Sequence, residues 1–315
     1  MSKTLAILNP FSGRGRAAKL FPQVETELKR AGIEYDLART RTALHAIQLA
    51  WEAHADGYER IIALGGDGLA HEIVNGLMRA SQEGETIALG VIPLGTGNDF
   101  NKMVPPACRV GQTHDNWRAA INTIARGKTD LFDIGRIVGD HPTPGHPHPH
   151  YFDNGMDVGF GALVAKHAGS VPSFLQGTSM YLAAVFKTLA NYQVPRLKIT
   201  LDDGTTIEQR STMTAIANGR CFGGGFWIAP EAMPDDGQFD LMIARGLGRA
   251  GILALVPRVM QGTHLTHPAV RMTRAARIVI DSPDPLVVEA DGELPFLEAH
   301  HLEIELLPRR LRLIV

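Results

Sequence analysis

The sequence predicts an α/β protein with two domains, a doubly wound α/β domain followed by an antiparallel β-sandwich-like domain. Three observations support this prediction. A buried strand at residues 61–64 leads through a glycine-rich turn into a helix, strand and helix patterns alternate over the first 130 residues, and strand patterns dominate afterwards. With 315 residues, the chain is long enough for each domain to bury its own core.

The turn GGDG at residues 65–68 organises the first domain. The four residues before it are apolar, and Ile73, Val74 and Leu77 after it have helical spacing. Such a junction brings backbone N–H groups and the positive end of a helix dipole close to a bound phosphate. Because an aspartate repels a phosphate, Asp67 predicts either a metal ion between the two groups or a polar group of the ligand that it orients.

Further strand and helix patterns surround this turn. Strands are expected at residues 5–8, 35–38 and 87–92. Apolar spacing predicts three more helices, with the faces Leu20, Phe21, Val24 and Leu28; Ile47, Ala50 and Trp51; and Trp117, Ile121 and Ile124, the last helix starting at Asp115. Repeated βα units predict a parallel sheet with helices on both faces.

Two other polar, glycine-containing loops also follow strands. They have the sequences NPFSGRG (residues 9–15) and PLGTGNDF (residues 93–100). The carboxyl ends of parallel strands share one edge of a sheet, and ligands bind beyond that edge. We therefore expect the three loops to converge on one site.

From about Asp130 the pattern changes to strands joined by turns such as Asp202-Asp203-Gly204. Strands are expected at residues 131–138, 151–158, 197–201, 206–217, 239–244, 278–280, 286–290 and 302–306, with helices at 174–191 and 249–261. The segment 139–150 contains four histidines, His141, His146, His148 and His150. Prolines between them argue against a compact zinc site, so we expect an exposed loop.

The composition excludes several classes of protein. A formal charge of −2 argues against a nucleic-acid binder, and 44% apolar with 20% charged residues is ordinary for a globular protein. The two cysteines, Cys108 and Cys221, fit a reducing compartment. No apolar run approaches the roughly 18 residues that span a bilayer, and the start of the chain lacks a signal-peptide pattern. We expect a cytoplasmic protein.

Six motifs follow one another along nearly the whole chain: AILNPFSGRGR, GGDGLAHEIVNGL, IPLGTGNDF, FDIGRI, NGRCFGGGFWIAPEAMPDDGQFDL and EADGELP. Together they resemble the lipid-kinase family of soluble bacterial diacylglycerol kinases, ceramide kinases and sphingosine kinases. The resemblance implies ATP- and Mg²⁺-dependent transfer of phosphate to the hydroxyl of diacylglycerol or a related lipid alcohol. It also implies transient contact with the inner face of a membrane, and it leaves a homodimer open.

The resemblance also assigns the domains. It implies an NAD kinase/diacylglycerol kinase-like nucleotide-binding catalytic domain at residues 1–130, completed by a C-terminal strand at about 308–315, and a β-rich lipid-substrate domain at 131–307. By the same resemblance, ATP contacts fall on Asn9, Ser12, Gly13, Thr40, Gly65, Gly66, Asp67, Gly68, Glu72, Gly95, Thr96 and Asn98.

The sequence has neither a Walker lysine motif nor a protein-kinase catalytic loop, so other groups must carry the phosphoryl transfer. The resemblance implies that Asp67, Asp99 and Asp133 hold the catalytic Mg²⁺, largely through water. It places the proton acceptor in the triplet Asp291-Gly292-Glu293, and the sequence does not separate Asp291 from Glu293.

A second, structural Mg²⁺ is implied in the segment 233–238. The carboxylate of Asp236 and the backbone carbonyls of Met233 and Gln238 would bind it, and an acidic turn without an ion is the alternative.

The chain departs from the family pattern at three positions. Leu69 and His71 replace the usual threonine and asparagine, and Gly161 stands where an aspartate often follows Gly-Phe. In some members that aspartate contacts polar groups of the substrate, so the identity of the acceptor stays open. Two rival functions remain, an NAD kinase-like small-molecule kinase and a lipid or nucleotide sensor without turnover.

Overall fold

The computed structural model describes residues 3–103, 116–170, 178–221, 223 and 225–315. The expected start of a helix at Asp115, the segment 174–177 and Cys108 lie outside the described residues. The helices are α1 (Ser12–Arg30), α2 (His45–Ala55), α3 (Asp67–Ser81), α4 (Phe100–Met103), α5 (Trp117–Arg126), α6 (Phe160–Ala168), α7 (Thr178–Asn191) and α8 (Arg249–Met260).

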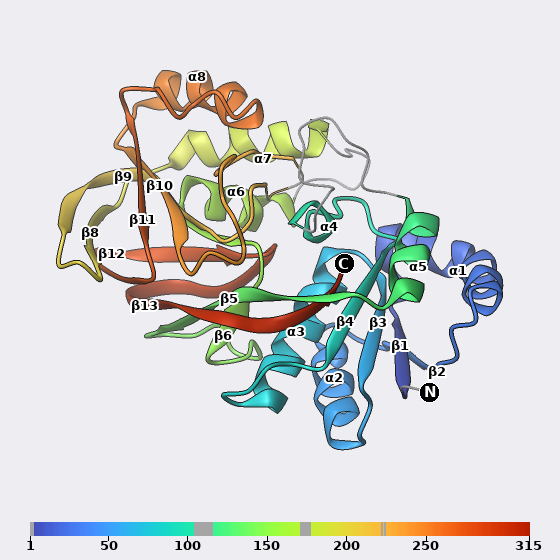
Figure 1. Ribbon diagram of the computed structural model, residues 1–315. Helices are drawn as coiled ribbons and strands as arrows, with labels where there is room; N and C mark the ends of the chain where they lie inside the picture. Colours follow the sequence, from blue (N-terminus) through green and yellow to red (C-terminus); the bar gives the residue numbers. More distant parts are fainter. Residues whose placement is uncertain (1–2, 104–115, 171–177, 222, 224) are drawn as a thin grey trace.

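Within the described part of the chain, a 13-stranded sheet forms the centre of the molecule (Figure 1). Its main path runs β11-β10-β9-β7-β12-β13-β4-β3-β1-β2, with β5, β6 and β8 paired alongside. The strands are β1 (Thr4–Leu8), β2 (Asp36–Arg39), β3 (Arg60–Gly65), β4 (Ala88–Pro93), β5 (Thr129–Gly139), β6 (His150–Phe152), β7 (Gly155–Gly159), β8 (Arg196–Leu201), β9 (Thr206–Ala217), β10 (Phe239–Arg245), β11 (Val270–Ala275), β12 (Arg277–Ala290) and β13 (Glu293–Ile314).

The first half is a doubly wound parallel sheet, as the sequence predicts. Strands β2, β1, β3 and β4 pair in parallel. In β3, Ile61 and Ala63 join a core with α2 and α3, whereas Ile62 and Leu64 join the opposite core with α1 and α5. Since successive side chains of a strand point to opposite faces, this division places two helices on each face of the sheet.

The second half is built from antiparallel strands, which confirms the predicted sandwich-like class. Strands β7 to β12 pair antiparallel around a core that contains Phe152, Phe239 and Phe296. Strands β5 and β13 run side by side from one half of the molecule to the other (Figure 1). The end of β13 pairs in parallel with β4, Leu313 opposite Leu89, so the last strand returns to the first sheet. The exact domain boundaries stay a prediction.

Some elements differ from the sequence predictions. The helix α6 and the strand β11 were not predicted, and the two strands expected within 278–290 form the single strand β12. The predicted face of α2 was only partly correct, because Ala50 is buried as expected but Trp51 is 52% exposed, and Ala46 and Ala53 are buried beside Ala50. His150 was expected in an exposed loop, but it starts β6 and is buried. Among the described residues, no helix is long and apolar enough to cross a membrane.

Candidate active site

The three polar loops meet beyond the carboxyl ends of β1, β3 and β4. A Cβ atom on Gly95 would lie 2.5 Å from the Cα of Gly66, and one on Gly13 would lie 2.8 Å from the carbonyl oxygen of Leu94. Heavy atoms do not approach so closely without displacement, so the loops can pack backbone to backbone only because these positions are glycine. The loops therefore converge, as the sequence predicts.

Internal hydrogen bonds shape the first loop and the residue that follows β2. The Oδ1 of Asn9 accepts from the backbone N–H of Phe11 at 3.0 Å, and the N–H of Ser12 donates to the carbonyl of Asn9 at 3.2 Å. Thr40 is buried, and its N–H donates to the carbonyl of Leu8 at 2.9 Å. Asn9 and Ser12 thus lie in the loop that the resemblance assigns to ATP, and Thr40 lies at the end of the neighbouring strand.

The third loop is held by contacts to its first glycine. The Nδ2 of Asn98 and the Nη1 of Arg16 each donate to the carbonyl of Gly95 at 3.3 Å. Asn98 has a φ of 51°, a left-handed conformation that asparagine adopts more readily than most residues. Thr96, between Gly95 and Gly97, is exposed, so a ligand could reach it.

Glu72 and Leu69, both on the helix α3, make structural contacts near the loops. The Oε2 of Glu72 accepts from the backbone N–H of Ala46 at 3.0 Å, so this carboxylate anchors the start of α2. Burial raises the pKa of Glu72. Leu69, which replaces the usual threonine, packs against Gly65, where its Cδ2 would lie 2.6 Å from an added Cβ. Leu69 therefore makes an apolar packing contact with Gly65 in place of the usual polar side chain.

A cavity of about 180 Å³, here called the acidic cavity, lies beside these loops. It is lined by carboxylates from separate parts of the chain together with small and polar residues: Asp67, Gly97, Asp99, Phe100, Asp153, Asn154, Gly223, Glu289, Asp291 and Gly292. The structure thus brings together Asp67, Asp99 and Asp291, three of the residues that the sequence singles out. Asp133 and Glu293 do not line this cavity.

The electrostatics of the acidic cavity fit a divalent cation. Burial, reinforced by the nearby charge of Asp99, raises the pKa of Asp67 to about 6. The Oδ1 of Asp67 accepts from the N–H of Phe100 at 3.0 Å, and Asp99 forms an ion pair with Lys102. A hard cation beside Asp67 and Asp99 would offset their repulsion. Within the described ranges, no group of three or more His, Cys, Asp or Glu side chains surrounds a common ion position.

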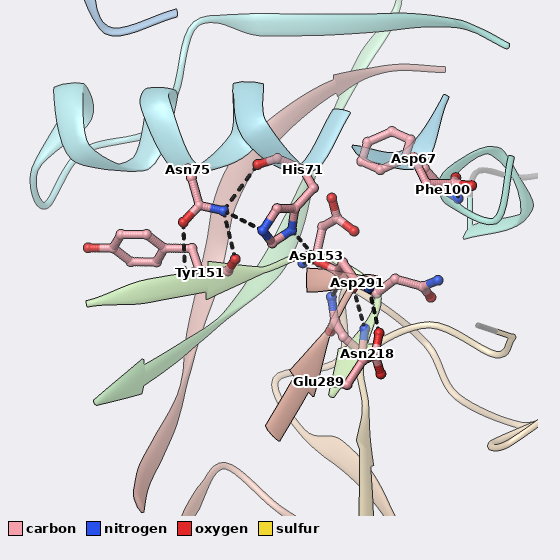
Figure 2. Close-up of polar contacts among 12 residues, drawn as sticks. Asp67, His71, Asn75, Phe100, Tyr151, Asp153, Asn218, Glu289 and Asp291 are labelled. Atoms are coloured by element: carbon pink, nitrogen blue, oxygen red, sulfur yellow. Dashed lines mark hydrogen bonds and ion pairs between the residues drawn. The ribbon is translucent and has the colours of Figure 1, made fainter. Parts of the chain in front are cut away.

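Asp291 is held by four hydrogen bonds (Figure 2). Its Oδ2 accepts from the N–H of Asp153 at 2.8 Å, and its Oδ1 accepts from the N–H groups of Asn154 at 3.2 Å and Gly155 at 2.9 Å. The fourth partner is the ring of His71. Asp291 itself has a φ of 50° at the turn between β12 and β13. Its carboxylate is therefore fixed in one orientation at the edge of the cavity.

The ring of His71 is oriented by Asn75 on the next turn of α3 (Figure 2). The Oδ1 of Asn75 accepts from the N–H of Tyr151 at 3.0 Å, which makes its Nδ2 the donor toward His71 Nε2 at 3.2 Å. Nε2 therefore accepts, and Nδ1 carries the proton that it donates to Asp291 Oδ2 at 3.1 Å. His71, in place of the usual asparagine, is a positioning residue for Asp291.

Sequence reasoning did not single out two buried residues beside Asp291. Burial, together with the charge of Asp291, raises the pKa of Asp153 well above its ordinary value. The Nδ2 of Asn218 donates to the carbonyl of Asp153 at 2.7 Å and to the carbonyl of Asp133 at 2.9 Å. The polar pair Asp153-Asn154 inside the predicted strand 151–158 was the signal that could have revealed Asp153.

Asp133 lies against the segment 233–238 rather than in the acidic cavity. Its carboxylate accepts from the N–H groups of Gly237 and Arg309, both at 2.8 Å, and burial raises its pKa. The carboxylate of Asp236 forms an ion pair with Arg274. The implied structural Mg²⁺ would have to displace this guanidinium in order to bind Asp236.

A second cavity of about 270 Å³, here called the apolar cavity, adjoins the acidic one. Side chains of α6, β9 and α8 form most of its wall, among them Phe160, Val164, Met213, Ile252, Leu255 and Val259. Gly223, Glu289 and Gly292 line both cavities. A ligand with an apolar body in one cavity could therefore place a polar end in the other.

Comparisons with known proteins agree with this architecture. Residues 3–137 match the family described as Diacylglycerol kinase catalytic domain, and residues 155–315 match the YegS C-terminal NAD kinase beta sandwich-like domain. A diacylglycerol kinase of Mycobacterium tuberculosis is 30% identical over 293 residues, which cover 93% of this chain and 89% of that protein.

Two solved structures share the fold. A diacylglycerol kinase from Bacillus anthracis has a TM-score of 0.70 at 20% identity, covering 99% of this chain and 96% of its own. Yeast NADH kinase complexed with NADH has a TM-score of 0.53 at 11% identity, covering 100% and 83%. Fold and site together define a two-domain kinase. The chain belongs to the diacylglycerol kinase family of lipid kinases.

Proposed function

We propose that the protein transfers the γ-phosphate of ATP to the hydroxyl of diacylglycerol or a related lipid alcohol. The observation that carries the proposal is the contact between the two cavities, which share Gly223, Glu289 and Gly292. A lipid alcohol has an apolar body and one reactive hydroxyl. With the body in the apolar cavity, the hydroxyl would lie beside Asp291 in the acidic cavity.

The nucleotide would bind over the converging loops. Their backbone N–H groups and the N-terminus of α3 suit the phosphates of ATP, and Arg16 adds positive charge at the third loop. Asp67 and Asp99 would hold Mg²⁺, which neutralises charge on the transferred phosphate when bound. Because Asp133 lies at the segment 233–238, its proposed part is to support that segment and not to reach the ion directly.

Asp291 is the proposed proton acceptor, since it lines the acidic cavity and Glu293 does not. The proton of the attacking hydroxyl would pass to the carboxylate of Asp291 as the oxygen bonds to phosphorus. Three backbone N–H groups and His71 keep this carboxylate aimed at the cavity. A positioned carboxylate of this kind typically contributes about 10²–10⁴-fold in rate.

Contact with a membrane surface is part of the proposal. Large apolar side chains stand exposed on the outer faces of α7 and α8: Leu182 at 44%, Phe186 at 61%, Leu253 at 42% and Met260 at 42%. Leu182 and Phe186 are four residues apart and share one helix face. These side chains could enter the lipid surface beside the apolar cavity, from which the substrate would be taken.

In the test, the purified protein is offered the acceptors of both candidate kinase activities, a lipid alcohol and NAD⁺. Radiolabelled ATP with Mg²⁺ is supplied together with diacylglycerol in mixed micelles and with NAD⁺. We expect label in the lipid fraction and none in NADP⁺. Label in NADP⁺ alone would support the NAD kinase-like alternative, and binding of ATP without label in either product would support a sensor.

A further inference from the structure

The wall of the apolar cavity carries a carboxyl group that the proposed chemistry does not use. Asp157 lies on β7, is 1% exposed, and lines the cavity among apolar side chains of α6 and α8. Glu289 is its partner in the register between β7 and β12, so both side chains lie on the same face of the sheet. A buried carboxyl group among apolar side chains destabilises a protein unless it is paired.

The carboxyl group of Asp157 occupies space that Gly161 leaves open. A Cβ atom added to Gly161 would lie 2.1 Å from Asp157 Oδ2 and 3.0 Å from its Cγ. Gly161 is in the first turn of α6, on the wall of the same cavity. The carboxyl group of Asp157 on β7 thus occupies the space that a side chain at position 161 of α6 would need.

Hydrogen bonds within the protein satisfy only part of this carboxyl group. It accepts from the backbone N–H of Ala162, but its Oδ1 has no partner among the described residues. The hydroxyl of Tyr192 lies nearby, yet it donates to the carbonyl of Thr212 at 2.6 Å. An unpartnered polar atom in a closed apolar site costs about 1–3 kcal/mol, so a ligand atom is the natural partner.

We propose that Asp157 recognises the lipid acceptor by hydrogen-bonding a carbonyl oxygen of its ester or amide group. The inference rests on the proposed function, because the lipid must lie in the apolar cavity. Burial raises the pKa of Asp157 to about 8, so near neutral pH its carboxyl group keeps the proton that it would donate to a carbonyl. Asp157 is thus a specificity residue, separate from the phosphoryl-transfer groups around Asp291.

The test compares two acceptors with the same reactive hydroxyl, dioctanoylglycerol and its diether analogue, which lacks the carbonyl oxygens. We expect the wild-type protein to prefer the diester. Asp157→Ala should raise the KM for the diester about tenfold, the effect of one lost hydrogen bond, and bring the two acceptors close to equality. The KM for ATP should not change.

Three further variants keep the test independent of folding. Asp157→Ala with Gly161→Asp moves the carboxyl group to the helix and should restore part of the preference, whereas Gly161→Asp alone creates the clash described above. Asp240→Ala, which removes a carboxylate of β10 outside both cavities, should leave the preference unchanged. A folded Asp157→Ala protein with unchanged KM and preference would overturn this inference alone. No turnover of either lipid by the wild-type protein would overturn the proposed function, and the inference with it.

Discussion

His71 and Asp291 are 220 positions apart in the chain, and the Nδ1 of His71 lies 3.1 Å from the Oδ2 of Asp291. The contact joins the helix after the glycine-rich turn to the turn between the last two strands. Both side chains are nearly buried, 3% and 5% exposed. The α/β half of the protein therefore positions the proposed base that the β-rich half supplies.

This contact predicts the behaviour of two substitutions. His71→Asn can still donate from its amide to Asp291, so we expect activity within about threefold of wild type. His71→Leu cannot, and kcat should fall about tenfold or more because the base loses its orientation. Steady-state kinetics measure both, with the KM for ATP as the control. An unchanged kcat in a folded His71→Leu protein would contradict the positioning role.

The close contact of the loops predicts that alanine has different effects at two of their glycines, Gly95 and Gly68. Gly95→Ala places a Cβ 2.5 Å from the Cα of Gly66, so it should lower the free energy of unfolding by about 1–3 kcal/mol and weaken ATP binding. Gly68→Ala meets nothing within 4 Å and lies within α3, so it should leave stability equal or higher by up to about 1 kcal/mol. Urea denaturation compares the two. Equal losses would argue against the packed-loop geometry.

The raised pKa of Asp67 predicts how Mg²⁺ binding depends on pH. A metal ligand must be deprotonated, and the pKa of Asp67 is about 6 without metal. The rise in Tm caused by Mg²⁺ should therefore be larger at pH 8 than at pH 5, and it should be lost in Asp67→Asn. Asp236→Asn, at the segment 233–238, should keep it. Loss in Asp236→Asn, with retention in Asp67→Asn, would place the ion at that segment instead.

The buried carboxyl group of Asp157 predicts a pH-dependent cost in stability. Its pKa is about 8 in the folded protein and about 4 in an unfolded chain, so between these values the native state binds the extra proton. Stability from this group therefore falls as pH rises from about 4 to 8. Asp157→Asn should raise Tm by more at pH 9 than at pH 5. Thermal unfolding measures this, and a gain that is equal at both pH values would contradict it.

Much of the fold follows from local patterns in the sequence. Side chains at 61–64 alternate between two cores, because successive side chains of a strand point to opposite faces of the sheet. The face of α2 was misjudged, because its core positions are alanines, which carry a weak apolar signal, whereas the exposed Trp51 carries a strong one. The helix α6 was missed because it starts in a glycine-containing stretch, Gly159-Phe160-Gly161, which resembles a turn.

The candidate site could be predicted only in part. Asp67 lies between two glycines and Asp99 lies two residues after Gly97, both in loops after strands, which is a local signal of a ligand site. The hydrogen bonds of Asp291 to Asp153 and His71, by contrast, depend on tertiary contacts across the whole chain. The proposed role of Asp157 could not be predicted from the sequence, since it depends on the space that Gly161 leaves in another element.

The most direct test of the central claim is the initial rate of lipid phosphorylation by Asp291→Ala, measured in mixed micelles with radiolabelled ATP. Circular dichroism and Tm confirm that the variant is folded, and ATP binding confirms that the loops are intact. We predict that the rate falls at least about 10²-fold while ATP still binds. A folded Asp291→Ala protein that phosphorylates the lipid at the wild-type rate would contradict the account.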